Sequence, residues 1–170
     1  SEQTLRESEE KYRRLVELSP DSIIIHCEGK ILFINYAGLK LIGAESINEI
    51  IGKSALHFVH PDFKDIAVQR IKRIYDNEEK GELIHEKFIK LNGDVIDVET
   101  TAIPINYDGK PSIQIIVRDI TARMRNEEML VKITGITIIA IKNNPKITEI
   151  EDVLRKKGQN FGCPSQKTVS

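Results

Sequence analysis

Two histidines and an aspartate lie close together near the middle of the chain and have the side chains of a metal site. They are His57, His60 and Asp62. Imidazole nitrogens and carboxylate oxygens are ordinary zinc ligands, but a structural site needs four of them and a catalytic site three. No second cluster in the sequence supplies the missing ligands. His60 also comes directly before Pro61, a residue that favours the first turn of a helix. We therefore expect a helix start here and no metal.

The tripeptide Gly52-Lys53-Ser54 has the residue types that end a phosphate-binding loop. Such a loop needs a glycine five positions before Gly52 and a strand leading into it, because its backbone amides surround the phosphate. Position 47 is isoleucine, and no strand-like run immediately precedes it. We expect an ordinary turn.

The sequence shows no residues arranged for catalysis. We find no serine–histidine–aspartate order, carboxylate pair or glycine-rich loop of that kind, so we expect no enzyme and no catalytic residues. Cys27 and Cys163 are too few and too far apart for a disulfide framework or a CxxC metal site. The basic run Arg155-Lys156-Lys157 is expected to be a solvated helix turn and not a nucleic-acid site.

The segment from Ile113 to Arg125 changes character in its middle. Its first half is a β-branched apolar run typical of a buried strand, and its second half favours a charged, exposed helix. Asp119 and Thr121 stand at the change, where side-chain oxygens can accept hydrogen bonds from the first free amides of a helix. We expect this junction to connect the interior of a domain to whatever follows it.

The elements that would position these residues follow from turn signals and periodicity. Glu28-Gly29, Asn92-Gly93 and Asp108-Gly109 each join two strand-like runs, since glycine tolerates the positive φ of a tight hairpin. After the first hairpin come short helical pieces and one clear amphipathic helix, Pro61 to Asp76, followed by three strands. We expect an α+β fold with an antiparallel sheet and helices on one face.

The chain divides into four expected segments. Residues 1–18 form an N-terminal amphipathic helix that starts at a capping box on Thr4, and residues 19–121 form the α+β domain. Residues 122–131 form an outgoing linker helix. Residues 132–170 are unassigned, apart from a short helix expected after Thr148 and a frayed tail. The N-terminal helix either packs on its own domain or joins two copies, and the sequence leaves both open.

Composition excludes several functional classes. The chain has 170 residues, of which 40% are hydrophobic and 30% charged, as in a globular protein. Its net charge of -1 argues against a strong attraction to nucleic acid or an acidic membrane. No apolar run approaches the ~20 residues of a membrane helix, and no signal-peptide pattern is present. We expect a cytoplasmic location, with neither nucleic acid nor membrane as a partner.

A series of short motifs in a particular order resembles a PAS domain over about residues 9–129. No single motif is specific, but their order and spacing together are. The resemblance implies the PAS fold, in which a five-stranded antiparallel sheet and the helices on one face enclose a small pocket. It also implies a sensory or dimerisation role, upstream of a histidine kinase, cyclase or transcription factor. The motifs are Pro20-Asp21-Ser22-Ile23, Glu28-Gly29-Lys30, Asn35 with Ala37 and Gly43, Gly52-Lys53, His60-Pro61-Asp62, Asn92-Gly93-Asp94 and Asp119-Ile120-Thr121.

The resemblance also bears on cofactors. PAS domains that hold haem typically supply a histidine from the long helix, but Pro61 to Asp76 contains none and His85 is a weak substitute. The related LOV flavoproteins carry a reactive cysteine in an Asn-Cys-Arg-Phe motif on a helix, whereas Cys27 lies on the first strand. Tryptophan, on which some flavin-binding PAS domains stack the ring, is absent. Haem and flavin are therefore disfavoured, which leaves a small molecule, a fatty acid or no ligand.

An apolar pocket of the PAS kind would be lined by core positions from several elements, each of which could equally be plain core. The expected lining residues are Ile25, Phe33, Leu39, Ile42, Leu56, Phe58, Ile66, Phe88, Val98 and Ile115.

Two functions fit the resemblance. A sensor of a small ligand or partner would relay its state through Asp119, Ile120 and Thr121, with Asp119 paired to a basic core residue, for which we predict Lys90. The alternative is a ligand-free PAS module that dimerises. A homodimer through the N-terminal helix and the sheet is expected in either case. All four histidines precede Asp119, so a kinase's phospho-acceptor helix is not in this chain, and a downstream kinase or other effector is the expected partner.

Overall fold

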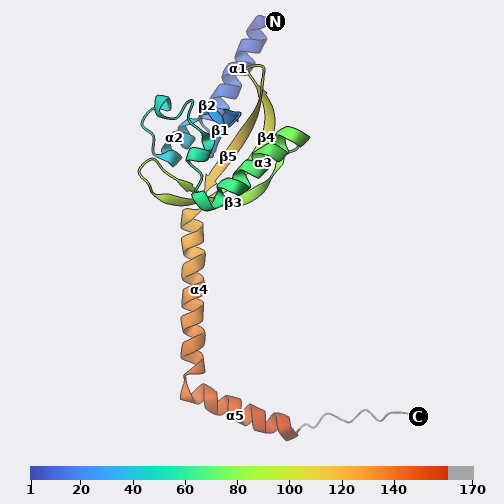
Figure 1. Cartoon of the computed structure of the whole chain (residues 1–170). Helices are drawn as coiled ribbons and strands as arrows, with labels where there is room; N and C mark the ends of the chain where they lie inside the picture. Colours follow the sequence, from blue (N-terminus) through green and yellow to red (C-terminus); the bar gives the residue numbers. More distant parts are fainter. Residues whose placement is uncertain (161–170) are drawn as a thin grey trace, which may run out of the picture. The chain divides into compact units, whose positions relative to one another are not determined.

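The computed structural model describes residues 1–160 (Figure 1). These residues divide into two compact units, one over residues 1–124 and one that begins at residue 125. The predictions for Cys163 and the frayed tail lie outside the described residues.

The first unit is built on one antiparallel sheet with the strand order β2-β1-β5-β4-β3. The expected five-stranded sheet is thereby confirmed. Its elements are α1 (Glu2–Glu17), β1 (Ser22–Cys27), β2 (Lys30–Ile34), α2 (Tyr36–Ile42), the 3-10 turns Ile47–Glu49, Ala55–His57 and Pro61–Phe63, α3 (Lys64–Asn77), β3 (Gly81–Ile89), β4 (Val95–Tyr107) and β5 (Lys110–Asp119).

Two hairpins close through tight turns in which both central residues are left-handed. The φ angles are 50° at Glu28 and 80° at Gly29, and 50° at Asp108 and 77° at Gly109. This is the backbone of a type I′ turn, whose twist matches that of the flanking strands. The turn signals in the sequence therefore located both connections correctly.

Helices α2 and α3 cover one face of the sheet, and the core lies between them and the strands (Figure 1). Ile42 of α2, Val98 of β4 and Val117 of β5 are almost completely buried there. Ile66 was expected on the buried stripe of α3 but is 51% exposed. The face of α3 that is buried is centred on Ala67, Arg70 and Ile74, and Ile66 lies beside it.

Helix α1 starts earlier than its sequence signal indicated. The Ser1 hydroxyl accepts a hydrogen bond from the Thr4 backbone N–H at 3.4 Å, so Thr4 lies inside the helix and the predicted cap at Thr4 is wrong. None of its side chains is buried. Several of its large apolar side chains are exposed: Leu5, Tyr12, Leu15 and, at the cap, Leu18.

The side chain of Asn35 joins the end of α1 to the sheet and to α2. Its amide nitrogen donates to the Val16 carbonyl at 2.9 Å and to the Asp21 carbonyl at 3.0 Å. Its carbonyl oxygen accepts from the backbone N–H groups of Ile23 and Gly38. Asn35 is fully buried, so these four bonds satisfy its amide where water cannot.

The second unit contains most of α4 (Thr121–Lys142) and α5 (Pro145–Asn160). The linker helix expected over residues 122–131 continues to Lys142 and includes the β-branched run around Gly135. Helix α5 begins at Pro145 and not at Thr148, and the side chain of Asn144, directly before it, accepts a hydrogen bond from the Lys146 N–H. No helix in residues 1–160 is both long and apolar enough to cross a membrane.

Candidate functional site

A small cavity lies in the core between α3 and the sheet. Its volume is about 50 Å³. It could hold a few water molecules, whereas pockets for drug-sized ligands measure roughly 300 Å³ or more. Its walls come from all five strands, the Ala55–His57 turn and its surroundings, and α3, and nearly all of them are apolar.

Four of the ten predicted pocket residues line this cavity: Leu56, Phe58, Phe88 and Ile115. Ile42 and Val98 are buried in the adjoining core, and Leu39 packs against that core. Ile66 is exposed, as described above.

Ile25 and Phe33 lie on the opposite face of the sheet. They border a groove with Tyr12 and Val16 of α1, while the neighbouring residue Ile24 lines the cavity. Successive side chains of a strand point to opposite faces. Because both faces of this hairpin are apolar, the alternation did not distinguish them, and the prediction placed Ile25 and Phe33 on the wrong face.

Two charged side chains stand on the otherwise apolar wall. They are Arg70 of α3, 7% exposed, and Glu86 of β3, 6% exposed. Thr100 of β4 joins them. Arg70 Nη1 donates to Thr100 Oγ1 at 2.8 Å, and that hydroxyl donates to Glu86 Oε1 at 2.7 Å. Arg70 Nη2 donates to the carbonyls of Thr100 and Glu82.

The hydrogen bonds leave one polar atom of each charged group unpaired. Arg70 Nε and Glu86 Oε2 are buried without a hydrogen-bond partner in the described part of the chain. Burial raises the pKa of Glu86, against the opposing effects of the Thr100 hydroxyl and of Arg70. Burial likewise lowers the pKa of Arg70, against the attraction of Glu86. The wall of the cavity therefore includes two charged side chains, which sequence reasoning missed. Arg70 within the apolar stripe of α3 was the available signal.

His26 of β1 is a second buried polar side chain. It is fully buried, and neither ring nitrogen has a hydrogen-bond partner within residues 1–160. Burial lowers the pKa of His26 to about 4, because the low-dielectric interior disfavours the charged imidazolium. His26 is therefore neutral at neutral pH.

The junction between β5 and α4 is bonded to the first part of β4, an interior strand of the sheet. The Ile120 N–H donates to the Asp97 carbonyl at 2.9 Å, and the Asp97 N–H donates to Thr121 Oγ1 at 3.0 Å. Asp119 Oδ1 accepts from the Thr121 N–H at 2.9 Å. Asp119 thus caps the start of α4, as predicted. Asp97 of β4 forms hydrogen bonds with Ile120 and Thr121, the two residues after Asp119.

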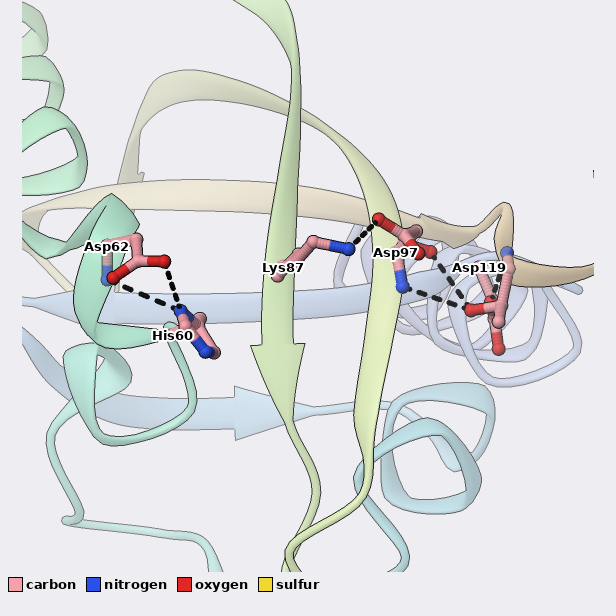
Figure 2. A network of polar contacts seen from close by, with 6 residues as sticks. His60, Asp62, Lys87, Asp97 and Asp119 are labelled. Carbon is pink, nitrogen blue, oxygen red and sulfur yellow. Dashed lines mark hydrogen bonds and ion pairs between the residues drawn. The ribbon is translucent and has the colours of Figure 1, made fainter. Parts of the chain in front are cut away.

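The predicted ion pair between Asp119 and Lys90 is not formed. Lys90 follows the last residue of β3, where its backbone N–H donates to the Asp94 carbonyl across the hairpin turn. The lysine at the junction is Lys87, whose Nζ lies 2.6 Å from Asp97 Oδ1 (Figure 2). The lysine that forms an ion pair in this region is therefore Lys87 and not Lys90. Its partner is the carboxylate of Asp97 and not that of Asp119.

Backbone bonds connect Lys87 to the loop at the start of α3. The Lys87 carbonyl accepts from the His60 N–H at 2.9 Å. His60 caps the Pro61–Phe63 turn, where its Nδ1 accepts from the Asp62 N–H at 3.3 Å (Figure 2). This is the helix-start role expected of His60. Next to it, the Ile89 N–H donates to the Phe58 carbonyl at 2.7 Å, so the loop that carries a cavity residue is fastened to β3.

The first turn of α4 has a further contact with the sheet. Glu99 Oε1 of β4 lies 2.6 Å from Arg123 Nη2 and 2.9 Å from His85 Nε2. The Arg123 hydrogen bond, together with His85, lowers the pKa of Glu99. At the same end of β5, directly before Asp119, Arg118 makes two hydrogen bonds to the carboxylate of Asp21.

The residues first considered for metal or phosphate have structural contacts instead. The Gly52 N–H donates to the Ile31 carbonyl and the Lys53 carbonyl accepts from the Ile31 N–H, so this turn pairs with β2 and does not form a phosphate loop. Within residues 1–160, no three histidine, cysteine, aspartate or glutamate side chains are grouped to hold a metal ion.

Comparison with known proteins agrees with this architecture. Residues 20–122 match the PAS domain family. The chain belongs to the PAS domain family. A curated relative, Sporulation kinase A of Bacillus subtilis (strain 168), is 31% identical over 135 residues. That match covers 79% of this chain but only 22% of the kinase, so most of the relative lies outside the comparison.

Solved structures show the same fold. A domain of the sensory box sensor histidine kinase/response regulator from Geobacter sulfurreducens has a TM-score of 0.58 and 28% identity, over 68% of this chain and 96% of that one. The PAS domain of an HTR-like protein from Haloarcula marismortui has a TM-score of 0.59 and 24% identity, over 69% and 96%. At that identity the second match supports the fold alone.

Proposed function

We propose that this PAS domain is a sensory, non-catalytic part of a signal-transduction protein, and that it relays changes at the cavity into α4. The observation that carries the proposal is the bonding of Ile120 and Thr121 to Asp97. Because the start of α4 is hydrogen-bonded to β4, an interior strand, a shift of β4 changes the support of the helix.

Strand β3 supplies the path from the cavity to Asp97. Glu86 and Phe88 line the cavity, whereas Lys87 between them pairs with Asp97. A change in cavity content that displaces Glu86 or Phe88 also moves Lys87, since all three share one backbone. Two arrangements that differ by a few kcal/mol would be enough for a switch, because a signal needs only to bias their populations.

The relatives support a signalling role for the intact protein. One is a kinase by name and another is part of a sensor histidine kinase/response regulator. A downstream kinase or comparable effector is therefore the proposed partner, and the intact protein is proposed to act in the cytoplasm.

A ligand-free interaction module is the second candidate. The cavity of about 50 Å³ favours it, since so small a space can be an ordinary packing defect. The exposed apolar side chains of α1, among them Leu15, suit a homodimer in either case. We then expect the Leu15→Glu substitution to weaken the dimer, as measured by light scattering. Gln3→Glu, which makes the same charge change on the same helix, should not weaken it. A monomeric wild-type protein would contradict the homodimer.

Native mass spectrometry of freshly purified protein separates the two candidates. The sensory proposal predicts a retained small molecule that is released on denaturation; a fatty acid would be retained only if the cavity of about 50 Å³ enlarges. A dimer whose mass is that of two bare chains, in repeated preparations, would favour the interaction module and contradict sensing of a tightly held ligand.

A further inference from the structure

We propose that the loop after α1 acts on the first turn of α4 through a row of side chains with alternating charges. The row consists of Asp21, Arg118, Glu99 and Arg123. Through it the position of α1 biases the outgoing helix without any change in the cavity. This inference rests on the proposed role of α4 as the output and adds α1 as a second input to it.

The first link of the row joins Asp21, in the loop between α1 and β1, to Arg118 of β5. Arg118 Nε donates to Asp21 Oδ1 at 3.1 Å, and Arg118 Nη2 donates to Asp21 Oδ2 at 2.9 Å. Two parallel hydrogen bonds fix the relative direction of the two groups as well as their distance. These bonds and the charge of Asp21 raise the pKa of Arg118. Because Arg118 directly precedes Asp119, the loop is tied to the residue before the cap of α4.

The second link joins Arg118 to α4 across β4. Arg118 lies directly opposite Glu99 in the register of β5 against β4. Val98 and Val117, next to them in the two strands, are buried in the core. Arg118 and Glu99 therefore lie on the other face of the sheet, where opposite charges on paired strands attract each other. Glu99 Oε1 lies 2.6 Å from Arg123 Nη2 in the first turn of α4, so the signs alternate from the loop to the output helix.

The position of Asp21 depends on the end of α1. The side-chain amide of Asn35 donates to the carbonyl of Val16, in the last turn of α1, and to that of Asp21. Asn35 is fully buried, so the loss of either bond leaves an amide hydrogen without a partner. A shift of the last turn of α1 is therefore accompanied by a shift of Asp21 and of the carboxylate that binds Arg118.

The row is suited to bias an equilibrium and not to hold the fold together. The side chain of Asp21 is 28% exposed and that of Arg118 is 63% exposed. A pair of this kind can change the ratio of two states about fivefold, which corresponds to about 1 kcal/mol. Such a change is small for the stability of a domain but large for the output of a switch.

Amide hydrogen exchange of the intact chain at Ile120 and Thr121 tests the inference, with Leu18→Pro as the change in α1. The Leu18 N–H donates to the Arg14 carbonyl at 2.9 Å. Proline removes this donor and disfavours a helical conformation of the preceding residue, so the last turn of α1 loosens. We expect exchange at Ile120 and Thr121 to change several-fold relative to Ile89, whose amide reports any general loss of stability. Leu18→Ala keeps the N–H and should not have this effect.

Substitutions in the row and outside it locate the path. Arg118→Met removes the ion pair to Asp21 and should abolish the response of the junction to Leu18→Pro. Arg73→Met, on the exposed surface of α3, should leave the response unchanged. An equal response in the Arg118→Met background, or no response to Leu18→Pro in any background, would overturn the inference.

The cavity variant Ala102→Val separates this inference from the sensory proposal, because Ala102 lines the cavity and is not part of the row. If exchange at the junction responds to Ala102→Val but not to Leu18→Pro, the inference is wrong and the relay from the cavity stands. If it responds to Leu18→Pro through Arg118 but not to Ala102→Val, the relay from the cavity is wrong and α1 remains an input.

Discussion

Thr121 Oγ1 accepts a hydrogen bond from the backbone N–H of Asp97 at 3.0 Å, so the first residue of α4 is bonded to the first part of β4. The same hydroxyl lies 3.4 Å from the Asp97 carbonyl. Strand and helix are far apart in the sequence but share these bonds, and the start of α4 is therefore sensitive to the position of β4.

The Thr121→Val substitution removes this hydroxyl while keeping the shape of the side chain. We expect a loss of about 1 kcal/mol in the free energy of unfolding, because the Asp97 N–H loses its acceptor. Amide hydrogen exchange should become faster at Asp97 and in the first turn of α4. Thr148→Val, in exposed α5, is the matched control. Unchanged exchange at Asp97 would contradict the role given to this bond.

The buried pair of Arg70 and Glu86 predicts strong coupling between two substitutions. Arg70→Met alone should destabilise the domain by about 3–5 kcal/mol, because Glu86 is left buried without its partner. Adding Glu86→Leu should recover much of that loss, as measured by urea unfolding. Arg73→Met serves as the exposed control. Additive effects of the two substitutions would show that the pair is not coupled.

Two glycines should respond to alanine in opposite directions. At Gly81 a Cβ would lie 2.9 Å from Ile74 Cδ1 and 3.0 Å from Arg70 Nε, so Gly81→Ala should cost about 1–3 kcal/mol. At Gly135 in α4 a Cβ meets nothing within 4 Å, so Gly135→Ala should stabilise the helix by up to about 1 kcal/mol. Thermal unfolding followed by circular dichroism measures both, and destabilisation by Gly135→Ala would contradict the helical placement.

His26 predicts a specific dependence of stability on pH. Its folded-state pKa of about 4 lies below the ordinary 6.5, so the unfolded chain takes up a proton first. The stability contributed by neutral His26 is therefore complete above pH 6.5 and is lost as the pH falls towards 4. The slope is ~1.4 kcal/mol per pH unit, with a total on the order of 3 kcal/mol.

The pH effect of His26 is isolated by comparison of variants, because carboxyl groups also titrate in this range. Glu86, with its raised pKa, acts in the opposite sense: its contribution is complete at low pH and is lost as the pH rises through its folded-state pKa. Unfolding free energies from pH 7 to 4 should fall less steeply in His26→Leu than in wild type. His57→Gln, at an exposed histidine, should leave the slope unchanged. Identical slopes in wild type and His26→Leu would rule out the burial effect.

The strand arrangement was accessible from the sequence because it depends on local signals. Glycine-containing turns such as Glu28-Gly29 and Asn92-Gly93 locate hairpins through backbone conformation alone. The start of a helix at Pro61 and the cap at Asp119 are local in the same sense. The longer α4 was missed because the β-branched residues near Gly135 have a strand propensity that holds only where a sheet exists to receive them.

The site was less accessible because it depends on contacts between distant elements. Lys87 pairs with Asp97 only through the register of β3 against β4, which no local pattern specifies, so the sequence alone does not distinguish Lys87 from Lys90. The face occupied by Ile25 was undetermined because both faces of its strand are apolar. Arg70 and Glu86 become a pair only when α3 packs on the sheet.

Amide hydrogen exchange at Ile120 and Thr121 tests the relay most directly, with Ala102→Val as the change in the cavity. This substitution should alter exchange at the junction by several-fold in the wild-type background. It should have no such effect together with Lys87→Met, which removes the ion pair to Asp97, but should keep it together with Lys72→Met on the exposed side of α3. An equal response in the Lys87→Met background, or no response in any background, would contradict a relay from the cavity to α4.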